Sequence, residues 1–178
     1  MLVKDHIWAI LLKLMKRWTR AQLLPLLDQH LSNLKDDSVI LSIGGYGIVD
    51  DYLRLRLSKS SAKLITFDID PSHQPDILGD IQHVDVTLAN LGVQPELIVA
   101  LEVLEHVGDP EKSIVSCHTV LSRGGIFIFS TPWIIPIHDK PNDFWRFTPH
   151  ALKKMSNCFK SVSIYARGSY FDSVIALL

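Results

Sequence analysis

The sequence has few cysteines and no excess of charge of either sign. Of its 178 residues only two are cysteines, Cys117 and Cys158, which stand far apart and in no spacing typical of metal ligands. A reduced, cytoplasmic protein is the simplest interpretation. The formal net charge is −1, so the composition gives no indication of bulk nucleic-acid binding.

A long uninterrupted hydrophobic run is also absent. The N-terminal stretch is apolar, but Lys13, Lys16, Arg17 and Arg20 interrupt it well short of a membrane-spanning length, and no signal-peptide cleavage site follows. Apolar residues recur at helical spacing between these charges. We predict a helical extension over residues 1–36 that packs on its own domain or closes a cleft. A basic amphipathic helix on a membrane surface is the less favoured alternative.

Repeats, low-complexity tracts and linkers are absent too, so residues 37–178 are predicted to form a single domain. Apolar runs rich in β-branched residues alternate here with helical patterns. Strands are expected at 38–43, 63–68, 76–78, 95–103, 126–132 and 159–166, and helices at 48–61, 108–125 and 148–158. This alternation predicts a doubly wound α/β fold with a mostly parallel sheet, preceded by the helical extension.

Local signals refine the predicted helices. Asp109 and Thr148 are expected to be N-caps, each followed by a proline at the first helical position. In the helix at 48–61 we expect Ile48, Tyr52 and Leu55 to form one face.

In such sheets ligands bind at the carboxyl ends of the strands. Gly44, Gly45 and Gly47 follow the first strand and would let the backbone approach a ligand closely. The G-x-G-x-x-G fingerprint is absent, which makes a nicotinamide-dependent oxidoreductase a distant alternative. Asp68 ends the second strand, 24 residues after Gly44 (68 − 44), close to the spacing at which an acidic residue binds a ribose. Asp70 is its rival, although a residue before proline favours an extended conformation.

Two further groups of residues follow strands. Asp80 comes after the short third strand and could accept a hydrogen bond from the exocyclic amine of a base, with Ile69 and Ile81 as apolar walls. After the fourth strand, "LEVLEH" places three polar residues at i, i+3 and i+4, so a helical turn would set them on one face. These residues are Glu102, Glu105 and His106.

Two stretches carry a family resemblance, "LEVLEHVGDPEKSIVSCHTVLSRGGIFIFSTP" and "HDKPNDFWRFTPHAL". Together with the preceding strands they resemble the class I S-adenosylmethionine-dependent methyltransferases of the methyltransferase type 11-like kind, from about residue 39 to 166. The resemblance implies that S-adenosylmethionine is the cofactor. It implies these cofactor-binding residues: Gly44, Gly45 and Tyr46 for the methionine part, Asp68 for the ribose, Asp80 and Ile81 for the adenine with Ile69 as a further wall of the ring, and Leu101 and Glu102 beside the sulfonium.

The chain departs from this family's pattern at the glycine-rich turn. The family usually has an acidic residue where Ser42 stands, and glycine where Tyr46 and Ile48 stand. These departures favour the alternative of a catalytically inactive, methyltransferase-like binding protein.

The resemblance also implies where the acceptor would bind. A sulfonium methyl is already activated, so catalysis is mainly positioning, with a general base where the acceptor is a hydroxyl. His106, His138 and Arg146 are the candidate catalytic residues, with Asp143 as a further candidate base. Arg146 could fix an anionic acceptor through its planar fork, or pair with Asp143 while the neighbouring aromatic residues pack the loop.

The acceptor itself is not specified by the sequence; we expect a small molecule or a glycan- or lipid-linked metabolite. Glu102, Glu105 and His106 also resemble a divalent-metal arrangement in some methyltransferases that act on vicinal hydroxyls. Because the same residues occur in relatives with no metal role, we assign no metal from the sequence.

Overall fold

The computed structural model describes residues 23–45 and 47–167. The chain divides into two compact units, and the main unit comprises Lys35–Trp133 with Ile137–Ile164. The other unit contains helix α2 (Leu24–Leu31), which has Pro25 in its first turn. Helix α2 lies within the predicted extension, whose first 22 residues are outside the described part of the chain. No helix among the described residues is long and apolar enough to cross a membrane.

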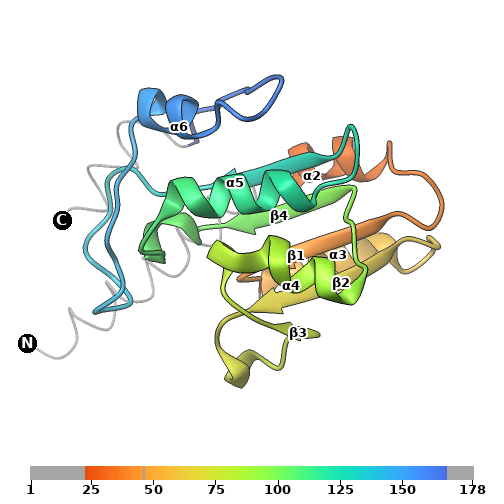
Figure 1. Ribbon diagram of the computed structural model, residues 1–178. Coiled ribbons are helices and arrows are strands. Elements are labelled where there is room, and N and C mark those ends of the chain that lie inside the picture. The colour runs from red at the N-terminus through yellow and green to blue at the C-terminus, as the bar shows by residue number, and fades with distance from the viewer. Residues whose placement is uncertain (1–22, 46, 168–178) are drawn as a thin grey trace, which may run out of the picture. The chain divides into compact units, whose positions relative to one another are not determined.

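The main unit is built on a five-stranded sheet in the order β3-β2-β1-β4-β5 (Figure 1). Every strand pairs parallel to its neighbours. The strands are β1 (Val39–Ile43), β2 (Lys63–Asp68), β3 (Ile77–Leu78), β4 (Leu97–Leu101) and β5 (Ile126–Ser130). The chain builds outward from β1 in one direction and then returns to β1 to build in the other. The predicted doubly wound α/β fold is therefore confirmed, with its switch point between β1 and β4.

Helices connect these strands. The helices are α3 (Ile48–Leu57), α4 (Val84–Leu91), α5 (Pro110–Val120) and α6 (Pro149–Met155), with short 3-10 turns η1 (Pro71–His73), η2 (Ile81–His83) and η3 (Leu104–His106). Helices α4 and α5 lie side by side on one face of the sheet (Figure 1). Both predicted N-caps are confirmed: Asp109 accepts from the Lys112 amide at 2.9 Å and Thr148 from the Ala151 amide at 3.1 Å.

The alternation of side chains along β1 assigns the two faces of the sheet. Leu41 and Ile43 join the apolar core, which also holds Leu88 of α4 and Ile114 of α5. Ser42 points to the opposite face, where its hydroxyl reaches α3. Every residue of β4 is buried, as expected for a central parallel strand covered on both faces.

The buried face of α3 differs from the prediction. Val49, Leu53 and Leu57 are buried, whereas Ile48 and Leu55 are 38% and 71% exposed. Both sets have apolar residues at helical spacing, so periodicity does not distinguish them. Packing against the sheet decides which of the two sets is buried.

The late strand predicted over residues 159–166 is wrong. These residues are described and form no strand, and most of them are exposed. Their alternating apolar pattern fits a strand, but a strand also needs a neighbour for its backbone hydrogen bonds. Among the described residues, nothing pairs with the outer edge of β5.

Candidate functional site

A pocket lies at the carboxyl ends of the central strands. Its lining includes Gly44 after β1, Asp68 and Ile69 at the end of β2, and Asp80 and Ile81 after β3. These are five of the residues predicted to bind the cofactor. Gly45, Leu101 and Glu102 are not part of this lining, and Tyr46 lies outside the described residues.

The turn after β1 requires its first two glycines. Gly44 has a φ of +61°, and a Cβ atom there would lie 2.6 Å from Cγ2 of Val103, another pocket residue. A Cβ atom on Gly45 would collide with the side chains of Ser42 and Asp50. Both positions therefore exclude a side chain, which keeps the backbone open beside the pocket.

Asp68 and Asp70 have different tasks. Asp68 is 7% exposed and lines the pocket, with Oδ1 accepting from the Asp70 amide at 2.8 Å and Oδ2 lying 2.9 Å from His73 Nδ1. The Asp70 side chain instead caps η1 by accepting from the Ser72 amide at 2.8 Å. Hydrogen bonds from the Ser72 hydroxyl and amide hold the pKa of Asp70 below its ordinary value. A carboxylate has about four lone-pair sites. Asp68 therefore retains acceptor capacity for a ligand.

Asp80 is held by Gln82, a residue that the sequence patterns did not single out. Gln82 donates to Asp80 from its backbone amide and from Nε2, both at 2.9 Å. Its Oε1 accepts from the Asp109 amide at 3.0 Å, which ties the pocket wall to the start of α5. Ile81 is 4% exposed and Ile69 is 69% exposed, so the two predicted apolar walls lie at different depths.

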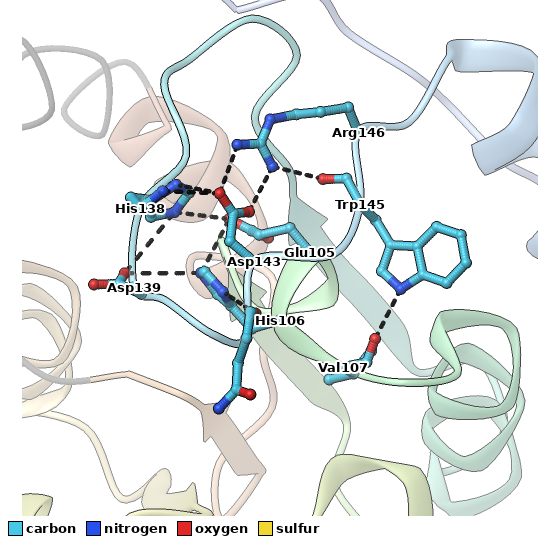
Figure 2. Close-up of polar contacts among 9 residues, drawn as sticks. Glu105, His106, Val107, His138, Asp139, Asp143, Trp145 and Arg146 are labelled. Carbon is cyan, nitrogen blue, oxygen red and sulfur yellow. Dashed lines mark hydrogen bonds and ion pairs between the residues drawn. The ribbon is translucent and has the colours of Figure 1, made fainter.

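A second group of polar residues adjoins this pocket, and we call Glu105, His106 and His138 the imidazole cluster. Glu105 and His106 come from η3, and His138 comes from the loop after β5 (Figure 2). Glu105 Oε1 lies 3.7 Å from His106 Nε2 and 4.0 Å from His138 Nε2. The two rings meet edge to face with centroids 4.9 Å apart. His106 also lines the pocket, so the cluster borders the predicted cofactor side.

Glu105 is the most deeply buried member of the cluster. Its side chain is fully buried, and burial raises its pKa to about 8. Neither of its carboxyl oxygens has a hydrogen-bond partner within the described part of the chain. The signal for Glu105 is present in the sequence, because it stands directly before His106 in the stretch "LEVLEH".

Arg146 is linked to the cluster through Asp143. Its guanidinium binds Asp143 through two hydrogen bonds, of 2.6 Å from NH1 to Oδ1 and 2.8 Å from NH2 to Oδ2. Asp143 Oδ2 accepts from the His138 amide at 2.9 Å and lies 3.2 Å from His138 Nδ1, a contact of ion-pair length without hydrogen-bond geometry. The guanidinium of Arg146 holds the pKa of Asp143 well below its usual range. The predicted brace between Arg146 and Asp143 is confirmed.

The aromatic residues beside Arg146 fix the loop. Trp145 Nε1 donates to the Val107 carbonyl at 2.8 Å, and Phe147 is buried in the apolar core. The amides of Phe144 and Trp145 both donate to the Glu105 carbonyl, at 2.9 and 3.2 Å. These bonds bring the loop after β5 against η3.

Glu102 does not share a helical face with Glu105 and His106. The turn η3 begins only at Leu104, and Glu102 has a φ of +60° with its amide donating to the Ser130 carbonyl at 2.9 Å. The expected set of three residues is therefore replaced by a set in which His138 joins Glu105 and His106.

Comparisons with known proteins identify the family and the fold. Residues 15–166 match the protein family described as "Methyltransferase domain". No curated protein sequence matches the chain. Among solved structures, a chain in the complex that contains the Haloferax volcanii Trm112 methyltransferase activator is 12% identical, with a TM-score of 0.54 over 81% of this chain and 74% of that one.

Two further structures share the fold. Haemonchus contortus phosphoethanolamine N-methyltransferase 2, solved in complex with S-adenosyl-L-methionine, is 10% identical, with a TM-score of 0.54 over 78% of this chain and 36% of that one. The small RNA methyltransferase HEN1 is 17% identical, with a TM-score of 0.52 over 80% of this chain and 21% of that one. The chain thus spans well under half the length of these two proteins.

Proposed function

Because the chain belongs to the family of methyltransferase domains, we propose that it transfers a methyl group from S-adenosylmethionine to a nucleophilic acceptor. The acceptor attacks the methyl carbon, the bond from carbon to sulfur breaks, and S-adenosylhomocysteine is released. The observation that carries this proposal is the pocket at the switch point of the sheet, where a glycine turn and the carboxylates of Asp68 and Asp80 face one space.

The pocket residues have complementary tasks in this proposal. Asp68 accepts hydrogen bonds from the ribose hydroxyls, and Asp80 with Ile81 meets the adenine, with Ile69 at the rim. Gly44 and Gly45, followed by Tyr46, approach the methionine part. Leu101 and Glu102 do not line the pocket, so the sulfonium would have to extend past the pocket lining to contact them.

The acceptor binds on the side of the imidazole cluster. His106 and His138 are positioned to take a proton from a hydroxyl acceptor, since neutral imidazole titrates near physiological pH. Arg146 acts through Asp143, because the bidentate pair occupies its fork. We propose a small molecule or a glycan- or lipid-linked metabolite as the acceptor; an RNA acceptor and an activator subunit are alternatives raised by two of the structural neighbours.

We propose a cytoplasmic location, which the thiols support. Cys117 and Cys158 are both free, which supports a reducing compartment such as the cytoplasm.

Calorimetric titration with S-adenosylhomocysteine tests the cofactor assignment. The wild-type chain is expected to bind it saturably, and Asp68→Ala is expected to abolish binding, because two hydrogen bonds to a charged group contribute about 1.5–3 kcal/mol each. Asp70→Ala is the matched control, since Asp70 caps η1 and does not line the pocket.

Equal affinity for wild type and Asp68→Ala would contradict the assignment of the ribose to Asp68. Absence of heat from the wild-type chain at millimolar ligand would favour the alternative of an inactive binding protein.

A further inference from the structure

We propose that the imidazole cluster, Glu105, His106 and His138, is a binding site for a divalent cation of the first transition row. One ligand atom from each residue lies within 4.8 Å of the others. The sequence patterns alone assign no metal, and the set of residues that they suggest contains Glu102 where the structure has His138. The binding site stands on its own geometry and does not require the proposed methyl transfer.

The Nδ1 atoms of the two rings both lie against oxygen acceptors. His106 Nδ1 lies 2.8 Å from the carbonyl of Asn142, which can only accept, so Nδ1 carries the proton. His138 Nδ1 faces the carboxylate of Asp143 at 3.2 Å. Nε2 of each ring lies toward Glu105 (Figure 2), and the bond to Asn142 leaves the lone pair of a neutral His106 ring on this atom. This is the arrangement typical of metal-binding histidines, whose second nitrogen donates to a carbonyl or a carboxylate.

The carboxylate between the rings lacks a donor. Glu105 is fully buried, and both of its oxygens are without a hydrogen-bond partner among the residues that the structure describes. Nε2 of both rings and the Glu105 carboxyl group thus face one another, and no donor from the rest of the described chain reaches that carboxyl group. A metal ion at the centre would satisfy all three groups, as would a proton shared among them.

Charge and spacing favour the metal ion. The side chains of Asp139 and Asp143 contact the rings of the cluster, and the guanidinium of Arg146 pairs with Asp143, so one acidic side chain remains for a cation to offset. Asp139 Oδ2 lies 3.9 Å from Nε2 of both rings and its side chain is 75% exposed, so it can close over an ion as a fourth ligand.

The candidate ligand atoms lie slightly farther apart than they would around a bound metal ion. Bonds of about 2.0–2.2 Å to nitrogen and oxygen place neighbouring ligand atoms about 3–3.5 Å apart. The separations of 3.7 and 4.0 Å from Glu105 Oε1 need to shorten by less than about 1 Å. Two imidazoles with one carboxylate suit zinc, iron, cobalt and nickel better than magnesium or calcium. Because His106 also lines the pocket, an ion here would lower the pKa of a hydroxyl bound beside it. This last role rests on the proposed function, and in it the ion replaces the imidazoles as the activating group, because a ring whose Nε2 binds a metal cannot accept a proton there.

Titration of the metal-free full-length chain with Zn²⁺ tests the site. We expect one saturable site whose occupancy raises the melting temperature, and a loss of affinity on the order of a hundredfold or more in Glu105→Gln and in His138→Ala. Asp143→Asn should weaken Zn²⁺ binding about 10- to 100-fold, because it removes the negative charge that lies 3.2 Å from His138 Nδ1. His150→Ala, which removes an exposed histidine of α6, is the matched control and should bind like wild type.

Glu105→Gln is expected to fold, because it replaces a buried carboxyl group with an amide of similar volume. If Glu105→Gln does not fold, the Zn²⁺ affinity of His138→Ala tests the site instead. Absence of saturable Zn²⁺ binding in wild type would overturn the proposal and leave a shared proton at the centre of the cluster. Unchanged binding in His138→Ala would also overturn it. Titration with S-adenosylhomocysteine separates the two hypotheses, since neither Glu105 nor His138 lines the pocket.

Discussion

The hydroxyl of Ser42, on β1, donates a 2.6 Å hydrogen bond to Oδ1 of Asp50, on α3. Both side chains are buried, with 1% and 7% exposure of the two residues. The family resemblance implies an acidic residue at the position of Ser42, and in this chain Asp50 of the following helix places a carboxyl group beside the glycine turn. Burial raises the pKa of Asp50 above its ordinary value, while the bond from Ser42 lowers it.

Ser42→Ala should destabilise the fold by about 1–3 kcal/mol, because it leaves a buried carboxylate without its donor. The free energy of unfolding from urea titration at pH 7 measures the loss. Asp50→Asn is the matched control: its amide oxygen can still accept from Ser42, so it should cost less than Ser42→Ala. An equal or larger cost for Asp50→Asn would mean that the charge itself stabilises the turn.

Asp50 and Asp76 should affect the pH dependence of stability with opposite signs. The raised pKa of Asp50 means that its contribution is present below pH 3.8 and is lost as the pH rises through the folded-state pKa. The pKa of Asp76 is lowered by the hydrogen bond from the Thr66 amide, so its contribution is present above pH 3.8 and is lost as the pH falls.

The prediction for Asp76 can be measured as the difference in unfolding free energy between wild type and Asp76→Asn. We expect a difference of about 1 kcal/mol at pH 7, reduced for the exposure of this side chain, that shrinks below pH 3.8. Asp36→Asn, at an exposed loop position, is the control. A difference that stays constant down to pH 3 would show that the bond to Thr66 does not depend on charge.

Gly44→Ala should impair both folding and ligand binding. Its positive φ alone costs about 1–2 kcal/mol with a side chain, and the new Cβ would push Val103, a wall of the pocket. Gly124→Ala is the matched control, because Gly124 has a φ of +82° and a Cβ atom added there would meet nothing within 4 Å. Unfolding and S-adenosylhomocysteine affinity should separate the two: both variants lose stability, and only Gly44→Ala loses affinity.

Arg146→Ala should lower the free energy of unfolding by about 2 kcal/mol, because the Asp143 side chain, 1% exposed, loses its bidentate partner. Arg146→Lys should recover little of this loss, since an ammonium cannot form both parallel bonds. Urea titration of wild type, Arg146→Ala and Arg146→Lys measures the free energy of unfolding. Full recovery with lysine would mean that charge alone, without the fork geometry, holds the loop.

The two histidines of the imidazole cluster should differ in their effect on the cofactor site. His106 lines the pocket and His138 does not, although their rings are in contact. His106→Ala should therefore weaken S-adenosylhomocysteine binding, whereas His138→Ala should leave it within about twofold. Calorimetry measures the S-adenosylhomocysteine affinity of both variants. A weaker affinity in His138→Ala alone would reverse the assignment of the two sides.

Much of the fold could be predicted from the sequence because its signals are local. Continuous apolar runs fix the central strands, and Asp109 and Thr148 begin their helices through bonds to amides three residues ahead. The position of Asp68 and Asp80 at one edge of the sheet also follows from local order, since parallel strands end on the same side.

The remaining features depend on contacts between distant segments. His138 meets Glu105 only because bonds between Trp145 and Val107, and between Arg146 and Asp143, fold the loop after β5 onto η3. No periodicity encodes such a meeting. The buried face of α3 and the absence of a late strand were likewise decided by tertiary packing and strand pairing, which select one among several local patterns of nearly equal energy.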